Sequence, residues 1–527
     1  MSVDDGRRAD PDRPAGPRDD RLHAARRIDW RFLLGSPALG RVRVVGTPDP
    51  WLQRGLDEAA DAVLIGSPTD RDDPLADTAV ITGHASTDAL REAVSSVGPD
   101  GRLVIEVDLV GSTGLVIPGT AVRSARALRA DGWTSVTTWW TWPVRSRPSL
   151  WARADDPVGL RALGRRLGQP RDAIVGTTAA LLGRFGAGRS LLASAAPAIT
   201  IVAERAEGTT SFVERRLGDC DGVLLVTPRF RASGHVIGIG LDREGRADRV
   251  VKISRLSDDV TLAHEADVLR ALEGVAPDSG PRVIDAGRDG WTSVVETGLA
   301  GRPLDPDAVR DDRPGAVRAV VDWLSTLPVQ PASARQMPVR QRIESALDAI
   351  LAFDQAAPGT TELGAMAERT RAYLDKLDAA ELPRVFEHGD AAHPNLIVRD
   401  DGRIVAVDWE RGEPDGLPLN DVTTALAYIA ASEVRAGTPA EQASAFASVA
   451  TGEGWAAAVL DAEAARAGVD PQLRPALVAV AWMRSVSWYA DALGGRDAAP
   501  EAVPWLASER LARHWAEALR IADRSSS

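Results

Sequence analysis

The stretch FEHGDAAHPNLIV, at residues 386–398, places a carboxylate and an amide five residues apart, in Asp390 and Asn395. A second acid, Asp408, stands further along the chain in IVAVDWE. The intervening sequence predicts two apolar strands around an Asp-Asp-Gly turn, and such a hairpin would return Asp408 to the side of Asn395. Because Mg²⁺ prefers hard oxygen ligands, Asn395 and Asp408 are the predicted metal ligands.

Asp390 is the carboxylate that this loop offers for proton chemistry. Phosphoryl transfer from ATP needs a carboxylate for the attacking hydroxyl, oxygen ligands for Mg²⁺ and a cation on the phosphates. Lys252, in the strand-like RVVKISR, can supply the cation. Glu265 follows on an amphipathic helix, where its carboxylate is suitably placed to hold the Lys252 ammonium.

The neighbourhood of Lys252 also indicates where a nucleotide would bind. RFRASGHVIGIG puts Ser233 and Gly234 at a hairpin turn, where free backbone N–H groups could cover phosphates. In SVVETGLAG, backbone groups near Glu296 and Gly298 could pair with an adenine edge.

The elements that must position these residues change character along the chain. Short apolar runs alternate with helical segments from 29 to 206, which predicts a doubly wound α/β sheet. Residues 222–255 instead alternate on the strand period and carry turn signals, which predicts antiparallel hairpins. Beyond about residue 303 a 3.6-residue periodicity dominates and predicts helices. The expected parallel strands are 41–46, 61–66, 77–83 and 101–110.

We therefore expect three parts. Residues 1–28 are charged and rich in proline and glycine, which predicts a disordered tail rather than a signal peptide. An α/β domain should occupy 29–206. An α+β domain with two lobes should occupy 207–525, its small lobe at 207–300 and its helical lobe at 301–525.

The order of Lys252, Glu265, HGDAAHPN and VDWE resembles the aminoglycoside phosphotransferase/choline kinase group of protein-kinase-like enzymes. The motifs cover roughly 222–430, and helical character extends the resemblance to about 525. It implies a protein-kinase-like fold, bound ATP and Mg²⁺, and transfer of phosphate to a hydroxyl of a small molecule.

The same resemblance gives individual residues their expected roles. It makes Asp390 the catalytic base, makes Asn395 and Asp408 the metal ligands, and pairs Lys252 with Glu265. Two further residues have expected roles close to the site. Asp421, in LPLNDVTTAL, matches a family acid near the start of a helix and is expected to be structural, and His388 is expected to fix the loop by hydrogen bonds.

The loop also departs from the family pattern. Ala391 and Ala392 follow the predicted base directly, and His393-Pro394 is displaced by one position. Protein kinases usually carry a lysine where Ala392 stands, so a protein substrate is disfavoured. The nucleotide loop has ASGHVIG in place of a GxGxxG run.

Plainer interpretations of these residues stay open. Lys252 could be a solvated lysine at a strand end, Glu265 a surface charge, and Asp421 a helix cap. Three acids after the second motif could face a substrate cleft and attract a cationic group, or could form a solvated acidic turn; they are Glu410, Glu413 and Asp415.

The segment 29–206 resembles a class I methyltransferase sheet in layout. VGPDGRLVIEV looks like the turn and fifth strand of that fold, and the Trp-rich 133–143 with 198–206 looks like its closing antiparallel pair. A cofactor-binding turn would need several glycines after the first strand. The chain has VVGTPDPWL there, with only Gly46 and two prolines, so we expect a non-catalytic domain.

Bulk properties bound the partners. The formal net charge of −13 argues against a general nucleic-acid or anionic-membrane binder. Cys220 is the only cysteine, so no internal disulfide can form, and the scattered histidines make a zinc site unexpected. No apolar run reaches the length of a membrane span. We expect a cytoplasmic protein.

The expected function is ATP- and Mg²⁺-dependent phosphotransfer to a hydroxyl of an aminoglycoside, sugar or amino alcohol. One alternative is a pseudokinase-type module that binds nucleotide for regulation. The other is a bifunctional methyltransferase-phosphotransferase, which the prolines at 48 and 50 disfavour.

Overall fold

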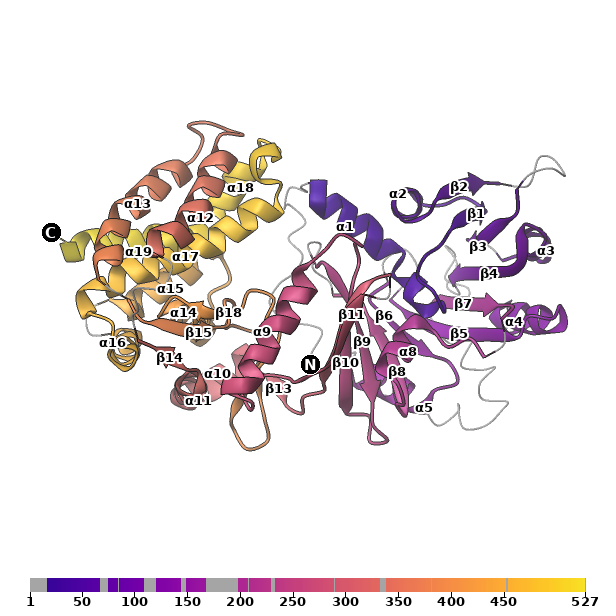
Figure 1. Cartoon of the computed structure of the whole chain (residues 1–527), viewed down its shortest axis with the longest axis horizontal. Helices are drawn as coiled ribbons and strands as arrows, with labels where there is room; N and C mark the ends of the chain where they lie inside the picture. Colours follow the sequence, from indigo (N-terminus) through magenta and orange to yellow (C-terminus); the bar gives the residue numbers. More distant parts are fainter. Residues whose placement is uncertain are drawn as a thin grey trace. The chain divides into compact units, whose positions relative to one another are not determined.

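The computed structural model describes residues 17–66, 74–83, 85–108, 120–143, 148–166, 198–206, 208–228, 233–288, 290–331, 338–380, 382–451 and 454–526. The chain forms two compact units (Figure 1). Among the described residues, the first unit comprises 21–263 and 283–299, and the second comprises 17–20, 264–282 and 300–526.

Twelve strands of the first unit form one sheet within the described residues, in the order β11-β12-β10-β9-β8-β6-β5-β7-β4-β3-β1-β2 (Figure 1). They are β1 (Arg41–Val45), β2 (Ala62–Ile65), β3 (Ala76–Thr82), β4 (Val97–Asp108), β5 (Ser135–Trp142), β6 (Leu150–Arg153), β7 (Ala198–Glu204), β8 (Gly222–Val226), β9 (His235–Leu241), β10 (Ala247–Ser254), β11 (Val283–Arg288) and β12 (Thr292–Thr297).

The parallel part of this sheet is the one expected from its apolar runs. β1 pairs in parallel with β2 and with β3, and β3 pairs in parallel with β4. The expected pairing of the Trp-rich strand β5 with β7 is also confirmed, and it is antiparallel. Strands that are buried on both faces have continuous apolar sequences, which is why these strands could be predicted.

Helices cover both faces of this part of the sheet. Neighbouring residues of a strand point to opposite faces, and in β4 Val104 joins one core while Leu103 joins the other. The Val104 core includes residues of α2 (Pro50–Ala59), α8 (Phe212–Leu217) and the 3₁₀ helix η1 (Asp29–Leu33). The Leu103 core includes residues of α3 (Thr87–Ser95), α4 (Thr120–Ala130) and α5 (Pro157–Arg166).

The sheet does not stop at the expected boundary between residues 206 and 207. β6 pairs antiparallel with β8, with Leu150 opposite Val226, so the expected α/β domain and the strands of the expected small lobe share one sheet and one unit. Residues 264–282 of the expected small lobe belong to the second unit instead. β8 is GVLLV and is buried along its whole length, so it needs a neighbour on each side. Hairpin signals reveal pairing only between strands that are adjacent in sequence, which is why this join was missed.

The expectation of a disordered tail at 1–28 is wrong for its last part. Residues 17–27 form the helix α1 (Pro17–Arg27), while residues 1–16 lie outside the described residues. Leu22 and Ala24 of this helix are buried, as is Ile28 after it. These few apolar positions suffice for packing, although the surrounding composition is highly charged.

The second unit is mostly helical, as its periodicity predicted, and α17 packs against α12, α13 and α19. Its helices are α9 (Thr261–Val275, from residue 264), α10 (Pro306–Asp311), α11 (Arg313–Thr326), α12 (Val339–Asp354), α13 (Leu363–Ala379), α14 (Asn420–Glu433), α15 (Pro439–Ala450), α16 (Trp455–Ala467), α17 (Arg474–Ala492), α18 (Ala502–Ser508) and α19 (Arg510–Ser526). Two small sheets accompany them, with strand orders β13 (Arg302–Pro303)-β16 (Leu396–Val398)-β17 (Ile404–Ala406) and β14 (Val329–Gln330)-β15 (Arg384–Glu387)-β18 (Glu413–Gly416).

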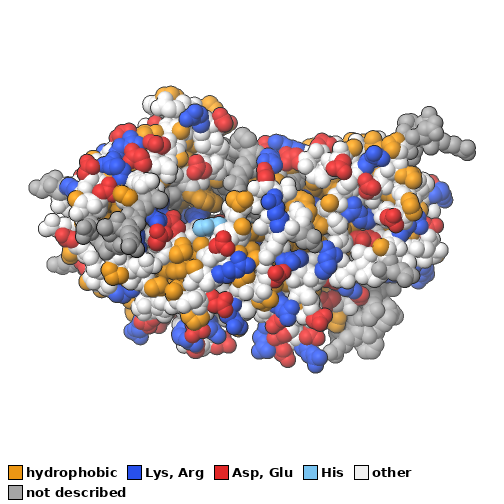
Figure 2. Space-filling model, viewed as in Figure 1, with side chains coloured by type: hydrophobic (Ala, Val, Ile, Leu, Met, Phe, Trp, Pro, Cys, Tyr) orange, Lys and Arg blue, Asp and Glu red, His pale blue; other side chains and the backbone are white. Residues whose placement is uncertain are grey.

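The surface mixes charges of both signs. Lys and Arg side chains are interspersed with Asp and Glu side chains over the visible face (Figure 2). None of the described helices has both the length and the apolar character that crossing a membrane requires.

Candidate active site

The loop between β15 and β16 carries the predicted base, and Asp421 holds its first turn. Both carboxylate oxygens of Asp421, at the start of α14, accept backbone hydrogen bonds, from His388 N at 2.7 Å and Gly389 N at 2.9 Å. Gly389 has φ +84°, and a Cβ there would lie 2.5 Å from the carbonyl oxygen of Arg411. The turn therefore requires glycine.

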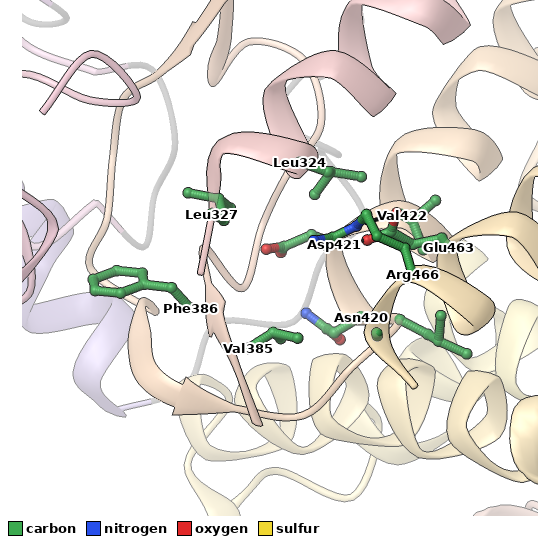
Figure 3. Close-up of a pocket in the computed structure, with 11 residues that line it drawn as sticks. Leu324, Leu327, Val385, Phe386, Asn420, Asp421, Val422, Glu463 and Arg466 are labelled. Carbon is green, nitrogen blue, oxygen red and sulfur yellow. Dashed lines mark hydrogen bonds and ion pairs between the residues drawn. The ribbon is translucent and has the colours of Figure 1, made fainter. Parts of the chain in front are cut away.

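Burial sets the protonation of Asp421. A cavity of about 20 Å³ beside it is lined largely by apolar side chains, among them Leu324, Val385 and Val422 (Figure 3). Burial, and then the nearby Glu387 carboxylate, raise the pKa of Asp421 to about 7, against the pull of its two backbone hydrogen bonds. Burial also raises the pKa of Glu387.

His388 is fully buried and joins the loop to the hairpin that follows. Its Nε2 lies 2.9 Å from the carbonyl oxygen of Val407, and its Nδ1 lies 3.2 Å from Asp390 N. Since a carbonyl accepts and an amide donates, the imidazole is neutral with its proton on Nε2. The His388 ring also packs edge-on against Trp409, with centroids 4.6 Å apart.

The hairpin expected after the loop is confirmed. β16 and β17 pair antiparallel with Leu396 opposite Ala406, and Val407 N donates to Asn395 O at 2.9 Å. The strand that leads to Asp408 thus returns to the side of Asn395. Asp408 has φ +72°, a left-handed conformation that is strained for a residue other than glycine and that clusters at functional sites.

Asp390 and Asn395 are brought together directly. Asn395 Nδ2 lies 3.1 Å from the carbonyl oxygen of Asp390 and 3.3 Å from its Oδ2. With the amide nitrogen of Asn395 facing Asp390, its oxygen remains as a ligand. An amide oxygen and a carboxylate are a donor set that fits Mg²⁺. No cluster of three or more His, Cys, Asp or Glu side chains able to hold a metal occurs in the described part of the chain.

Glu265 is fully buried, so it is not the surface charge of the plainer interpretation. Its Oε1 accepts a hydrogen bond from Trp409 N at 2.9 Å, directly after Asp408 in sequence. Glu265 belongs to the second unit and Lys252 to the first, and their ion pair stays a prediction.

Lys252 is 5 % exposed, so it is not a solvated strand-end lysine either. Its Nζ lies 3.9 Å from Glu296 Oε1 on the neighbouring strand β12. The sequence indicated only the backbone near Glu296 as functional and missed this carboxylate, whose proximity follows from strand register. Gly298 N donates to Asp248 O at 2.7 Å, which leaves the Gly298 carbonyl as the group that could meet an adenine edge.

Ser233 and Gly234 lie between the antiparallel strands β8 and β9, as expected for a hairpin connection. Residues 229–232 of this connection lie outside the described residues. Ser233 and Gly234 carbonyls both accept hydrogen bonds from Arg255, and Arg255 is paired with Asp29 in η1. Asp29 and Arg255 were missed, because nothing in the sequence relates positions so far apart.

The acids after the second motif line a cavity of about 560 Å³ in the second unit, which Gly389 also lines. Two of the three acids, Glu413 and Asp415, pair with arginines that also line the cavity, and the Asp415 side chain is half exposed. Glu413 lies 2.7 Å from both Arg342 and Arg484, and Asp415 also pairs with Arg342. The arginines and Trp488 of this cavity were not recognised in the sequence.

Comparison with known protein families finds a match to part of the chain. Residues 239–460 match the model of the phosphotransferase enzyme family (APH). A comparison with curated proteins found no match.

Comparison with solved structures gives matches of low sequence identity. A thermostable mutant of aminoglycoside phosphotransferase APH(4)-Ia, in a ternary complex with ADP and hygromycin B, is 14% identical, with 60% of this chain and 98% of that chain covered and a TM-score of 0.39. A choline kinase from Cryptosporidium parvum is 12% identical, with 57% and 90% covered and a TM-score of 0.36. An aminoglycoside phosphotransferase from Streptomyces rimosus is 18% identical, with 49% and 89% covered and a TM-score of 0.32.

Proposed function

We propose that this chain, which carries a phosphotransferase enzyme family domain at residues 239–460, transfers the γ-phosphoryl group of ATP to a hydroxyl of a small molecule. The observation that carries the proposal is the loop in which Asn395 contacts Asp390 while the hairpin returns toward Asp408. One carboxylate and two further oxygen ligands, brought together by the loop and the hairpin that follows it, suit positioning and charge stabilisation, which is most of what this reaction requires of a protein.

Each residue of the loop then has a role. Asp390 accepts the proton of the acceptor hydroxyl, while Asn395 and Asp408 hold Mg²⁺, which would neutralise charge on the phosphates. His388 and Asp421 keep the loop in place through the hydrogen bonds described above.

The nucleotide would be bound by residues of the strands and their connections. Lys252, fixed by Glu265, binds the phosphates, and the backbone of Ser233 and Gly234 covers them. The backbone near Glu296 and Gly298 pairs with the adenine edge. The acceptor would enter the cavity that Gly389 lines, beside Asp390.

Two variants test this function. Asp390→Asn should lower kcat by roughly 10²–10⁴-fold, the usual contribution of a general base, with Mg-ATP binding retained. Asp408→Ala should remove the Mg²⁺-dependent rise in Tm that ATP gives, about 2.7 kcal/mol of stabilisation at 100 times Kd. Asp400→Ala, on the exposed turn of the same hairpin, is the matched control. Wild-type turnover by the Asp390 variant would refute the assignment, and nucleotide binding without any transfer would favour the pseudokinase alternative.

We further propose that the part of the first unit formed by residues 29–206 is methyltransferase-like and has no catalytic activity. Gly46, after β1, has φ +103°, and a Cβ there would lie 2.4 Å from the carbonyl oxygen of Thr82. The backbone is thus packed against its neighbour where a cofactor-binding turn would need open space. Calorimetric titration with S-adenosylmethionine should give no binding, and micromolar binding would support the bifunctional alternative.

A further inference from the structure

Arginines of the wall pair with three of the four acids that line the 560 Å³ cavity. Glu413 is held by both Arg342 and Arg484 at 2.7 Å, and Glu387 accepts from Arg484 Nη1 at 2.7 and 2.9 Å. Asp415 pairs with Arg342 as well. A polycationic acceptor needs several carboxylates that can pair with it, and three of the four that line this cavity, all but Glu410, are already engaged by arginines.

Arg411 is different from the other two arginines of this wall. Its guanidinium lies 3.6 Å from the centre of the Trp488 ring, and it makes no ion pair with any of the described residues. Its Nε, like that of Arg342, is buried without a hydrogen-bond acceptor, but the described residues give Arg411 no carboxylate partner to compensate for it. A buried donor left without a partner is costly, so such groups usually have a partner in the functional complex.

We propose that Arg411 binds an anionic group of the acceptor, a carboxylate or a phosphate, in the cavity beside Asp390. This proposal rests on the proposed phosphotransfer function. Stacking on Trp488 fixes the plane of the guanidinium, and its fork of N–H groups matches two oxygens of an oxyanion. A cationic group placed against the Arg411 guanidinium would meet repulsion between like charges.

Calorimetry on the full chain with saturating Mg-ADP tests this inference. The probes are matched sets of anionic, neutral and cationic compounds: gluconate, glucitol and glucosamine for a carboxylate, glucose 6-phosphate and glucose for a phosphate, and kanamycin as a polycation. One anionic probe should bind at least tenfold more tightly than its neutral partner. Arg411→Gln should abolish that preference. Arg318→Gln, an exposed arginine on α11, is the matched control and should keep it.

Preferred binding of glucosamine or kanamycin, no preference for either anion, or a preference that survives in Arg411→Gln would overturn the inference. The Tm response to Mg-ATP, recorded on the same samples, distinguishes failure of the proposed function from failure of the acceptor inference. If the nucleotide site itself is wrong, that response is missing; if the site binds nucleotide without transfer, the response is present and no acceptor is phosphorylated; if only the acceptor class is wrong, the response remains without an anion preference.

A separate observation in the first unit concerns the connection between β8 and β9. Asp29 is fully buried, and its carboxylate accepts from Arg255 Nε at 3.0 Å and Nη2 at 2.8 Å, and from Thr227 Oγ1 at 2.8 Å. Arg255 in turn donates from its side chain to Ser233 O and from its backbone to Gly234 O. One carboxylate therefore holds residues on both sides of this connection.

We infer that Asp29 is a positioning residue for the turn of Ser233 and Gly234, and so for the nucleotide phosphates; this too rests on the proposed function. The segment before the first strand then serves the nucleotide site. Asp29→Asn keeps the size of the side chain but removes the negative charge that pairs with Arg255. Thr227→Val removes only the hydrogen bond from Thr227 Oγ1 to Asp29.

Steady-state kinetics on both variants provide the test. The KM for ATP should rise about tenfold in Asp29→Asn and less in Thr227→Val, with the KM for the acceptor unchanged, and Asp29→Glu should restore part of the loss. A purely structural role would lower the active fraction, and with it kcat, at an unchanged KM for ATP, and that result would overturn the inference. If no nucleotide response exists in the wild type, the proposed function fails first.

Discussion

The Arg27 guanidinium forms a two-pronged ion pair with the Glu106 carboxylate, at 2.7 and 2.8 Å. Both side chains are buried, and Arg27 also reaches Asp49, the N-cap of α2, at 3.0 Å. In open α/β sheets, ligands bind outside the carboxyl ends of the parallel strands. Here the Arg27 side chain, from the end of α1, contacts both the end of β4 and the N-cap of α2.

Arg27→Ala should therefore destabilise the first unit strongly. It leaves the Glu106 carboxylate buried without its partner, a change that costs about 3–5 kcal/mol. Denaturant unfolding followed by tryptophan fluorescence measures the loss. Arg54→Ala, which removes an exposed ion pair with Glu58, should cost at most about 1 kcal/mol, and equal effects of the two variants would contradict this account.

Gly389→Ala should disable the loop by a clash rather than by conformational strain alone. Gly389 and Gly402 have nearly the same φ, +84° and +81°, but a Cβ at 389 would meet the Arg411 carbonyl at 2.5 Å, while one at 402 meets nothing within 4 Å. Gly402→Ala thus isolates the cost of the left-handed backbone. We expect activity to be lost in Gly389→Ala and retained in Gly402→Ala, with Tm lowered more in the first. Similar behaviour of both variants would rule out the clash.

Asp421 should make stability depend on pH. Its pKa is about 7 in the fold against an ordinary value of 3.8, so between these values the folded chain keeps a proton that the unfolded chain has released. Stability therefore falls as the pH rises from about 4 to about 7. Asp421→Asn removes this contribution, which is on the order of a few kcal/mol at 1.36 kcal/mol per pKa unit.

The measurement is the difference in unfolding free energy between wild type and Asp421→Asn across this pH range. The wild type should lose stability relative to the variant as the pH rises. Asp400→Asn, on the exposed turn, is the matched control. A pH-independent difference would show that Asp421 is already ionised throughout.

Two substitutions of Glu265 should separate its structural role, as hydrogen-bond acceptor for Trp409 N, from its proposed electrostatic role as the partner of Lys252. Glutamine at this position can still accept the hydrogen bond from Trp409 N, whereas alanine cannot. We expect Glu265→Gln to keep the wild-type Tm and to weaken ATP binding, because the proposed partner of Lys252 is then uncharged. Glu265→Ala should lose about 1–3 kcal/mol of stability as well. Unchanged ATP affinity in Glu265→Gln would remove Glu265 from the nucleotide site.

Much of the architecture could be predicted because it depends on residues that are close together in the sequence. The helices of the second unit follow a 3.6-residue period, and the hairpin of β16 and β17 follows its Asp-Asp-Gly turn. The stretch from His388 to Asn395 was recognisable because base, ligand and glycine lie within one loop. Where local composition misled, as with the charged α1, a few apolar residues outweighed many charged ones.

The sequence by itself determined which residue types stand on the loop, in what spacing, and which runs become helices and strands. Only the tertiary structure decided that β6 pairs with β8, that Glu296 lies beside Lys252, and that Asp29 meets Arg255 across 226 positions. The physical reason is that strand register and buried ion pairs come from packing between distant segments. Many strands and many charged residues are chemically suitable partners for one another, and only the packed core brings a particular pair together.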